Sequence, residues 1–245
     1  MNRDELLELL EAVSKGELKP DDAAGKLSMS WDGFNGDMGR GLRLGFDEVI
    51  FGRGKTKEQI EQIAGEYLSN ELNFFCTGLD DQKYAYLSGI YPQFEYNPLA
   101  GTMRYMKKEP VKLNGTAAVI TAGTSDMKVA LEAAETLEIL GIEHEIYSDI
   151  GVAGLHRFVN RAEQIRAKDV IIVVAGMEGA LPSVVGGSFP QPVIAVPSSV
   201  GYGVSKGGFT ALLGMLSSCA PGVTVVNIDN GYGAAVAAFR ILNGR

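Results

Sequence analysis

Cysteine, histidine and tryptophan are scarce in this sequence of 245 residues, which contains two cysteines, two histidines and one tryptophan. The cysteines, Cys76 and Cys219, stand far apart, so we expect neither a disulfide framework nor a cysteine zinc site. The histidines form no tight group with carboxylates, so a structural transition-metal site is not expected either. Each thiol therefore has to be judged by its own neighbours in the sequence.

Long apolar runs and an excess of basic charge are also lacking. No apolar stretch reaches the roughly 18 residues needed to cross a bilayer, and the start, MNRDELLELLEAV, has no basic leader or apolar block of a secretion signal. Acidic residues outnumber basic ones, 30 to 22, whereas a nucleic-acid surface needs a basic patch. We therefore expect a cytoplasmic protein with no nucleic-acid or membrane partner. A small anionic ligand remains compatible with this charge, because a few local cations and backbone N–H groups can hold it.

Residues 1–112 have the pattern of a smaller, mixed α+β domain. A helix is expected to begin at Thr56, with Gln59 placed for a capping box. Two short helices and three strand-like segments are expected at about 4–13, 21–26, 48–51, 72–77 and 94–106.

Residues 113–245 alternate apolar strand-like runs with helical segments. Several runs are apolar on both faces, as in a buried parallel sheet. This alternation predicts right-handed βαβ units in a doubly wound α/β domain. The expected strands lie at 117–121, 145–147, 170–175, 193–196 and 223–228, and the expected helices at 127–140, 155–166, 181–185, 209–216 and 234–242.

Ligands of such sheets bind beyond the carboxyl ends of the strands. The first strand ends in GTSD, where Gly123 would let a phosphate approach the helix N-terminus. Alternatively, Ser125 or Asp126 only caps that helix. After the second strand, His156 and Arg157 together are suited to a carboxylate or phosphate, or else lie on an ordinary helix surface.

The third strand leads into Gly176-Met177-Glu178, where the acidic residue has glycine and apolar neighbours. Burial there would favour the neutral carboxyl of Glu178 and suit it to carry a proton, whereas an exposed turn carboxylate is the alternative. The glycine-rich loop after the fourth strand contains Ser199 and Lys206 and enters a helix, as an anion site does. A mobile linker would have a similar composition.

Cys219 lies in the small-residue turn SSCAPG after that helix, and we expect it at the ligand-facing edge of the sheet. A free cysteine is usually an inert apolar residue. Cys219 therefore has two interpretations, an unreactive residue of this kind or a catalytic nucleophile. Asp229, Asn230 and Gly231 form another glycine loop that opens the last helix. Cys76, in the apolar run FFCT, is expected in the core.

These motifs resemble two related families. GTSD, AGLHR, AGMEGALP and DNGYG are similar, in this order over residues 115–245, to the carboxyaminoimidazole ribonucleotide mutases of purine biosynthesis. That similarity implies a PurE-like, flavodoxin-type fold. The segment RLGFDEVIFGRGKT at 43–56, with GVAGLHR and SSCAPG, looks like the LarB family over most of the chain.

The LarB resemblance implies a pyridinium-3,5-biscarboxylic acid mononucleotide synthase, the carboxylase and hydrolase of nickel-pincer nucleotide biosynthesis. Its substrates would be nicotinic acid adenine dinucleotide and carbon dioxide or bicarbonate, and its products the biscarboxylated mononucleotide and AMP. Cys219 matches the family's nucleophile and Glu178 its nearby acidic residue, so covalent catalysis with proton transfer is implied. The dinucleotide is the substrate, so no organic cofactor is implied; Mg²⁺ suits the hydrolysis. The family also implies a homo-octamer.

The substrate-binding residues expected from the loops and from the resemblance are Gly123, Ser125, Asp126, His156, Arg157, Gly176, Met177, Ser199, Lys206, Asp229, Asn230, Gly231, Arg43 and Lys55. Metal ligands and the residues of the hydrolytic step remain open. An aminoimidazole ribonucleotide carboxylase or mutase of the PurE type is one alternative; it needs no Cys219 and leaves the N-terminal half unexplained. A nucleotide-binding module without turnover is another.

Overall fold

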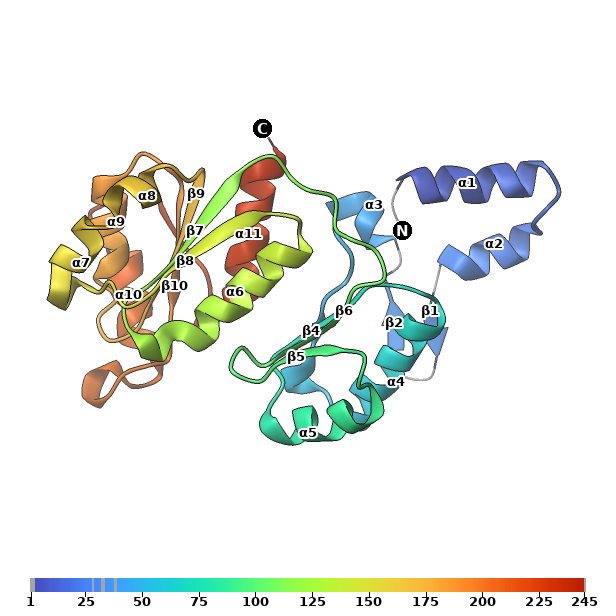
Figure 1. The fold of residues 1–245 in the computed structure, drawn as a ribbon, viewed down its shortest axis with the longest axis horizontal. Coiled ribbons are helices and arrows are strands. Elements are labelled where there is room, and N and C mark those ends of the chain that lie inside the picture. The colour runs from blue at the N-terminus through green and yellow to red at the C-terminus, as the bar shows by residue number, and fades with distance from the viewer. Residues whose placement is uncertain (1–2, 28, 32–33, 38, 245) are drawn as a thin grey trace.

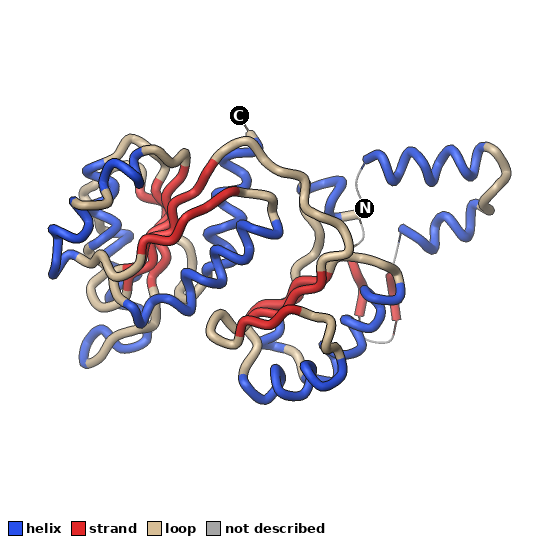
Figure 2. The backbone as a smooth tube through the Cα atoms, viewed as in Figure 1, coloured by secondary structure: helices blue, strands red, loops and turns tan. Residues whose placement is uncertain are grey.

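The computed structural model of the protein describes residues 3–27, 29–31, 34–37 and 39–244. A five-stranded sheet and a four-stranded sheet each have their own hydrophobic core, and they lie side by side in Figures 1 and 2. We call the part around the four-stranded sheet the N-terminal unit and the part around the five-stranded sheet the C-terminal unit. The connection between them runs from the end of one sheet at Tyr105 to the start of the other at Thr116. The predicted domain boundary at 112/113 falls in this connection and stays a prediction.

The five-stranded sheet is wholly parallel and has the order β11-β10-β9-β7-β8. In chain order this is 2-1-3-4-5, the flavodoxin-type arrangement, so the predicted doubly wound α/β fold is confirmed. Its strands are β7 (Thr116–Thr121), β8 (Glu143–Tyr147), β9 (Val170–Ala175), β10 (Val193–Pro197) and β11 (Val223–Val225).

Apolar side chains on both faces explain why these strands form a buried sheet. In β9, Ile172 and Val174 pack into one core, and their neighbours Ile171 and Val173 pack into the core on the opposite face. Helices α6 (Met127–Ile139) and α11 (Gly231–Asn243) cover the first face. The second face is covered by α7 (Leu155–Val159), α8 (Ala162–Arg166), α9 (Leu181–Ser188) and α10 (Phe209–Leu216).

The four-stranded sheet has the order β3-β4-β6-β5, with only β3 and β4 parallel. Its strands are β3 (Ile50–Phe51), β4 (Phe74–Thr77), β5 (Glu95–Asn97) and β6 (Thr102–Tyr105), and it packs with α4 (Lys57–Ser69) and α5 (Asp81–Ile90). The capping box at the start of α4 is confirmed. The Gln59 N–H donates to Thr56 Oγ1 at 3.2 Å, and the Thr56 N–H donates to Gln59 Oε1 at 2.9 Å.

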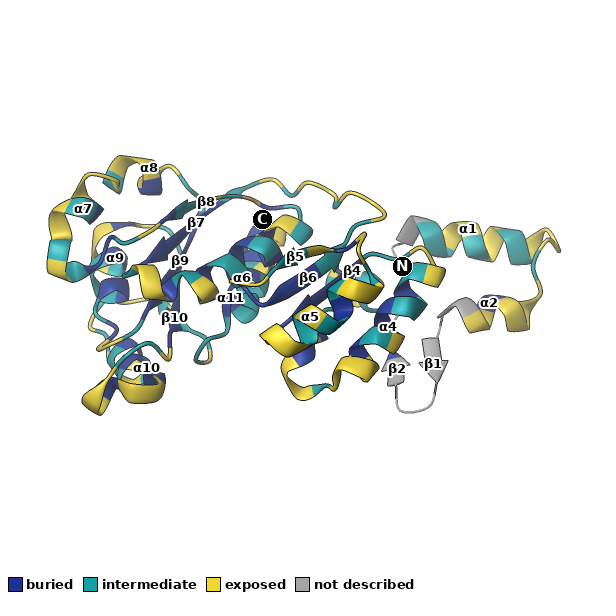
Figure 3. Ribbon diagram, turned by 60° about the horizontal axis from the view of Figure 1, so that its bottom comes forward, coloured by how far each residue is buried: buried dark blue, intermediate teal, exposed yellow. Residues whose placement is uncertain are grey.

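The remaining N-terminal elements are α1 (Arg3–Ser14), α2 (Pro20–Leu27), β1 (Met29–Trp31), β2 (Phe34–Gly36) and α3 (Arg40–Leu44). Both helices of the α1–α2 hairpin were predicted, and they project from the rest of the chain (Figure 1). Figure 3 shows exposed residues along both, in contrast to the buried strands of the five-stranded sheet. None of the described helices is long and apolar enough to cross a bilayer.

The structure corrects two predicted helices and adds α5, which was not predicted. The single helix expected at 155–166 is broken into α7 and α8, where the Arg161 N–H closes a turn on the Phe158 carbonyl. Helix α5 was missed although Asp80 caps it, accepting from the Lys83 N–H at 2.9 Å; its tyrosines obscured the helical pattern. The last helix begins at Gly231 rather than at 234, because Asn230 caps it through the Gly233 N–H.

Candidate functional site

The loops after β7, β9, β10 and β11 are joined by hydrogen bonds at the carboxyl edge of the five-stranded sheet; we call them the carboxyl-edge loops. Asp126 is their centre and is 3% exposed. It accepts from Ser198 Oγ at 2.5 Å and from the Gly123 N–H at 2.9 Å. Desolvation raises the pKa of Asp126, and these donors partly offset the rise.

Residues in left-handed conformations stand where three of the strands end. Asp149 follows β8, Met177 follows β9 and Asp229 follows β11, with φ values of 56°, 54° and 55°. Each such residue costs about 1–3 kcal/mol unless its surroundings fix it. Here the surroundings do so: the Met177 N–H donates to the Val200 carbonyl at 3.0 Å, and Asp229 Oδ1 accepts from the Ser199 N–H at 2.7 Å.

A serine-to-alanine change at position 198 tests how strongly these loops are held together. Ser198→Ala leaves the buried Asp126 carboxylate with one donor fewer, so we expect a loss of about 1.5–3 kcal/mol in unfolding free energy. Ser199→Ala is the matched control, because Ser199 is exposed and uses its backbone N–H, which alanine retains. Urea denaturation measures both. Equal midpoints for the two variants would show that the Ser198–Asp126 bond adds nothing.

Cys219 does not lie at the carboxyl edge, which corrects the expectation from the sequence. Helix α10 runs back along the sheet, and Cys219 lies in the turn between its end and β11. Val223 begins β11 beside Val193, the first residue of β10, so this turn approaches the amino edge. The thiol is exposed, whereas Cys76 is buried as predicted.

Glu178 and the Cys219 turn are nevertheless held in a fixed relation by the packing of α10 against the loop before α9. Gly214 of α10 approaches Glu178 so closely that any Cβ there would clash with the Glu178 carbonyl. Next to Cys219, Ser218 Oγ shares a hydrogen bond of 2.7 Å with Ser183 Oγ of α9. Glu178 is exposed in this chain, so the burial expected from its neighbours is not found.

The other predicted binding residues differ in whether their side chains are exposed or already have a partner within the chain. Arg157 is ion-paired with Asp149, so its guanidinium already has a carboxylate partner. The side chains of Ser125, His156, Ser199 and Lys206 are exposed. Gly176 lies against the next loop, where a Cβ would clash with the Val200 carbonyl, and so allows the two loops to meet.

Helix α6 contributes to the loop after β11 a functional candidate that the sequence did not reveal. Glu132 of α6 accepts from the backbone N–H groups of Gly231 and Tyr232 at 3.0 and 3.4 Å. The predicted anion site at Gly231 is therefore capped by a carboxylate of the chain itself. Its sequence signal is the spacing Glu132, Glu135, Glu138, which places all three on the side of α6 that meets the N-terminal unit.

Lys55 and Arg43 lie in different parts of the N-terminal unit. Lys55 follows the turn 52–54, whose Arg53 acts electrostatically on Glu132, so it belongs to the side of the carboxyl-edge loops. Arg43 lies on α3 and forms an ion pair with Asp37, with 2.6 Å between Arg43 Nη2 and Asp37 Oδ2. Gly45, at the end of α3, packs against Phe239 near the end of α11, so Arg43 lies towards the amino edge. The structure does not bring Arg43 to the other predicted residues.

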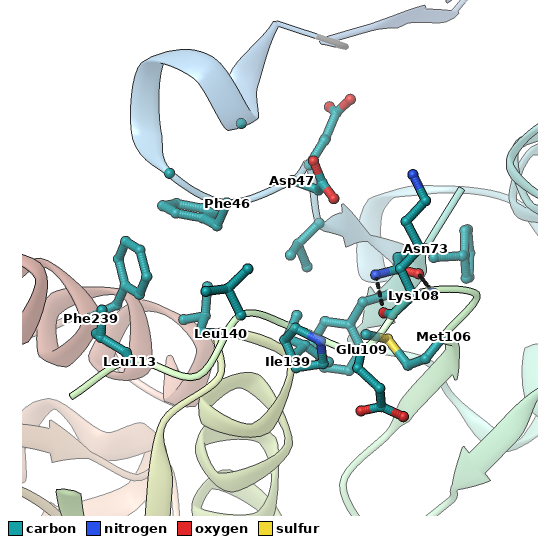
Figure 4. A pocket seen from close by; sticks show the side chains of 18 of the residues that line it. Phe46, Asp47, Asn73, Met106, Lys108, Glu109, Leu113, Ile139, Leu140 and Phe239 are labelled. Carbon is teal, nitrogen blue, oxygen red and sulfur yellow. Dashed lines mark hydrogen bonds between the residues drawn. The ribbon is translucent and has the colours of Figure 1, made fainter. Parts of the chain in front are cut away.

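A cavity of about 300 Å³ lies between the two units, at the opposite edge from the loops (Figure 4). Phe46, Leu140 and Phe239 line it on one side, and Asp47 and Lys108 on another. It contains none of the predicted binding residues. We place the candidate site at the carboxyl-edge loops instead, because ligands of parallel sheets bind beyond the carboxyl ends of the strands. Among the described residues, no three His, Cys, Asp or Glu side chains are arranged to hold a metal ion.

Comparison with known proteins matches both halves of the chain. The model of the LarB/PurE-like N-terminal domain matches residues 32–108, and the AIR carboxylase model matches residues 116–245. The chain is 38% identical over 246 residues to the protein MJ0165 of Methanocaldococcus jannaschii, covering 95% of each. It is 36% identical over 129 residues to the N5-carboxyaminoimidazole ribonucleotide mutase of that organism, covering 51% of this chain and 76% of that enzyme.

The crystal structure of Treponema denticola PurE aligns with 52% of this chain and 80% of its own, at 25% identity and a TM-score of 0.44. The two family models together account for the four-stranded and the five-stranded sheet of the structure. The chain therefore belongs to the LarB family, with a C-terminal domain of the PurE-like AIR carboxylase type.

Proposed function

We propose that the protein is a pyridinium-3,5-biscarboxylic acid mononucleotide synthase. It would convert nicotinic acid adenine dinucleotide and carbon dioxide or bicarbonate into the biscarboxylated mononucleotide and AMP. The observation that carries this proposal is an exposed thiol, Cys219, in a turn tied to α9 by the bond between Ser218 and Ser183, in a chain that also has the LarB N-terminal domain. A mutase of the PurE type leaves both features without a role.

A thiolate is what this carboxylation requires, because an electron-poor pyridinium ring cannot attack carbon dioxide through carbon. Addition of the Cys219 thiolate to a ring carbon forms a C–S bond and leaves an enamine whose carbon 5 is nucleophilic. Carbon 5 then forms a C–C bond to carbon dioxide. Loss of the proton from carbon 5 returns an electron pair to the ring, the C–S bond breaks, and the thiolate leaves. The net change replaces a ring hydrogen by a carboxylate and releases a proton.

Glu178 is proposed as the proton acceptor, either from the thiol or from ring carbon 5. Its loop is bonded to that of β10 through Met177 and packed on α10 through Gly214, so its backbone is fixed. The Glu178 side chain is exposed in the single chain. A bound substrate or a neighbouring subunit would supply the burial that favours a neutral carboxyl.

The hydrolytic step requires neutralisation of the leaving phosphate and an oriented water. Lys206 is an exposed cation in the loop after β10, and Arg157 stands beside Asp149 after β8. Mg²⁺ would be bound largely through the substrate phosphates, as it usually is with nucleotide substrates. These residues and the loop N–H groups are the proposed phosphate contacts.

Assembly into a homo-octamer is part of the proposal and has one structural support. Five large apolar side chains gather on α10 and the loop before it, each between 64% and 91% exposed: Tyr202, Val204, Phe209, Leu213 and Leu216. An apolar surface of this kind marks an interaction site rather than ordinary solvent-facing structure. Since it adjoins the Cys219 turn, we propose that a second copy of the chain covers it.

Leu213→Glu tests this assembly surface. A carboxylate in an apolar interface would lose its hydration, so we expect the variant to remain folded but to dissociate. Light scattering after size exclusion should give about eight times the 26.1 kDa chain mass for the wild type and a smaller mass for the variant. Lys128→Glu, at an exposed position outside this surface, is the control and should retain the wild-type mass. A wild type that is monomeric at micromolar concentration contradicts the octamer.

The proposed reaction is tested by incubating the protein with bicarbonate, Mg²⁺ and nicotinic acid adenine dinucleotide. Mass spectrometry should show AMP and the biscarboxylated mononucleotide in equal amounts. In parallel, N5-carboxyaminoimidazole ribonucleotide should remain unchanged; its conversion would favour the mutase alternative. Binding of the dinucleotide without any product would favour a binding module.

A further inference from the structure

Of the three α6 glutamates, Glu132 is the one that both faces the N-terminal unit and bonds to a carboxyl-edge loop. It accepts from the N–H groups of Gly231 and Tyr232, directly after Asp229 and Asn230. From the N-terminal unit, the charge of Arg53 and the hydroxyl of Thr77 both act to lower the pKa of Glu132, against the rise that its burial causes. A single carboxylate thus links the end of β4 to the start of α11.

The chain is closely packed at both ends of this link, at Thr77 and at Gly231. Thr77 is 2% exposed and is the last residue of β4. Gly231 lies so close to α6 that any Cβ would clash with the Val129 carbonyl, so α11 cannot shift along α6 freely. Asp229, which precedes this point, has a left-handed conformation and bonds to the loop after β10. Movement of Glu132 would therefore be transmitted to the substrate loop.

We propose that Glu132 is a positioning residue through which the N-terminal unit sets the geometry of the loop 227–231, and with it the affinity for the nucleotide. This inference rests on the proposed function, because that function makes the loop a substrate contact. The N-terminal unit accordingly acts on the site without carrying its reactive groups. Glu132 does not touch the reacting atoms.

Helix α6 itself offers a closely matched control. Glu135 accepts from Thr102 Oγ1 and from Asn97 Nδ2, again linking α6 to the N-terminal sheet. Thr102 is 1% exposed and bonds to Glu135, so Thr77 and Thr102 are both buried threonines whose hydroxyls act on an α6 glutamate. Of these two links, only the one through Glu132 reaches Gly231 and Tyr232.

The experiment compares Thr77→Val with Thr102→Val in the full-length protein. Each loses one hydroxyl with almost no change of shape. We expect the Kd for nicotinic acid adenine dinucleotide, measured by titration calorimetry, to rise about tenfold in Thr77→Val and less than twofold in Thr102→Val. Glu132→Ala should weaken binding at least as much as Thr77→Val does, and Glu132→Gln less, because its amide oxygen still accepts from the Gly231 N–H. The Thr77→Val/Glu132→Ala double variant should be non-additive.

Hydrogen exchange provides a readout that needs no ligand and no turnover. The amides of Gly231 and Tyr232 should exchange about tenfold faster in Thr77→Val than in the wild type or Thr102→Val, because the carboxylate that accepts from them is held less firmly. Equal exchange and equal affinity in the two valine variants overturn the inference even if the enzyme is active. If Thr77→Val shows faster exchange and weaker binding but the wild type has no turnover, the role of Glu132 is supported and the proposed reaction is excluded. Absence of dinucleotide binding by the wild type removes both.

Discussion

Replacement of Cys219 by alanine is expected to lower kcat for carboxylation by about a thousandfold or more, since removing a covalent nucleophile costs at least this much. The exposed thiol lies in a turn fixed by Ser183 and Ser218, so alanine should leave the turn in place. Product formation is followed by mass spectrometry, and circular dichroism checks the fold. Incubation with NAD, a close substrate analogue, should also give an intact-protein mass adduct in the wild type and none in the variant.

Cys76→Ala is the control that shows whether activity depends on Cys219 in particular or on either of the two thiols. Cys76 is fully buried in the N-terminal core, and burial raises the pKa of its thiol to about 12, so it does not supply a thiolate at neutral pH. We expect this variant to retain most of its activity and to lose about 1 kcal/mol of stability. A fully active Cys219→Ala protein would remove thiolate addition from the mechanism.

Glu178→Gln is expected to lower kcat by about 10²–10⁴-fold with little change in KM, as for the loss of a general base. Glutamine has the same shape but cannot accept a proton. The backbone contact with Gly214 does not depend on the side chain, so the loop should keep its position. Steady-state kinetics over a range of dinucleotide concentrations separates the two parameters.

The adduct with NAD distinguishes the two roles proposed for Glu178. If it takes the thiol proton, Glu178→Gln should form the Cys219 adduct slowly. If it takes the proton of ring carbon 5, the adduct should form normally and product should not appear. Glu163→Gln, at an exposed carboxylate of α8, is the matched control and should behave as the wild type. Wild-type kcat in Glu178→Gln would remove it from the catalytic set.

The fold of the C-terminal unit was predictable because its strands are strongly apolar and its loops are rich in glycine. Strand β9 and helix α10 have the boundaries expected from the sequence. The α7–α8 break was not predictable, because it depends on one turn at Asn160 and Arg161 rather than on a proline or glycine. Helix α5 was missed because Tyr84 and Tyr86 favour strands in isolation, whereas here they pack within the N-terminal unit.

The candidate site was predictable to the extent that it follows from strand order. Gly123, Asp126, Gly176 and Asp229 were expected at strand ends, and the structure joins their loops. The position of Cys219 was not, because it depends on where α10 ends relative to the sheet. Glu132 was also missed, since an acidic residue on an amphipathic helix ordinarily faces water, and only the packing of the second unit shows otherwise.

The proposed function requires the protein to join a carboxyl group to the pyridine ring of a dinucleotide. The most direct measurement uses ¹³C-labelled bicarbonate with nicotinic acid adenine dinucleotide and the wild-type protein. Mass spectrometry should show one ¹³C atom in each biscarboxylated mononucleotide and one AMP for each product formed. An intact dinucleotide, or a mononucleotide without the label, would contradict the account.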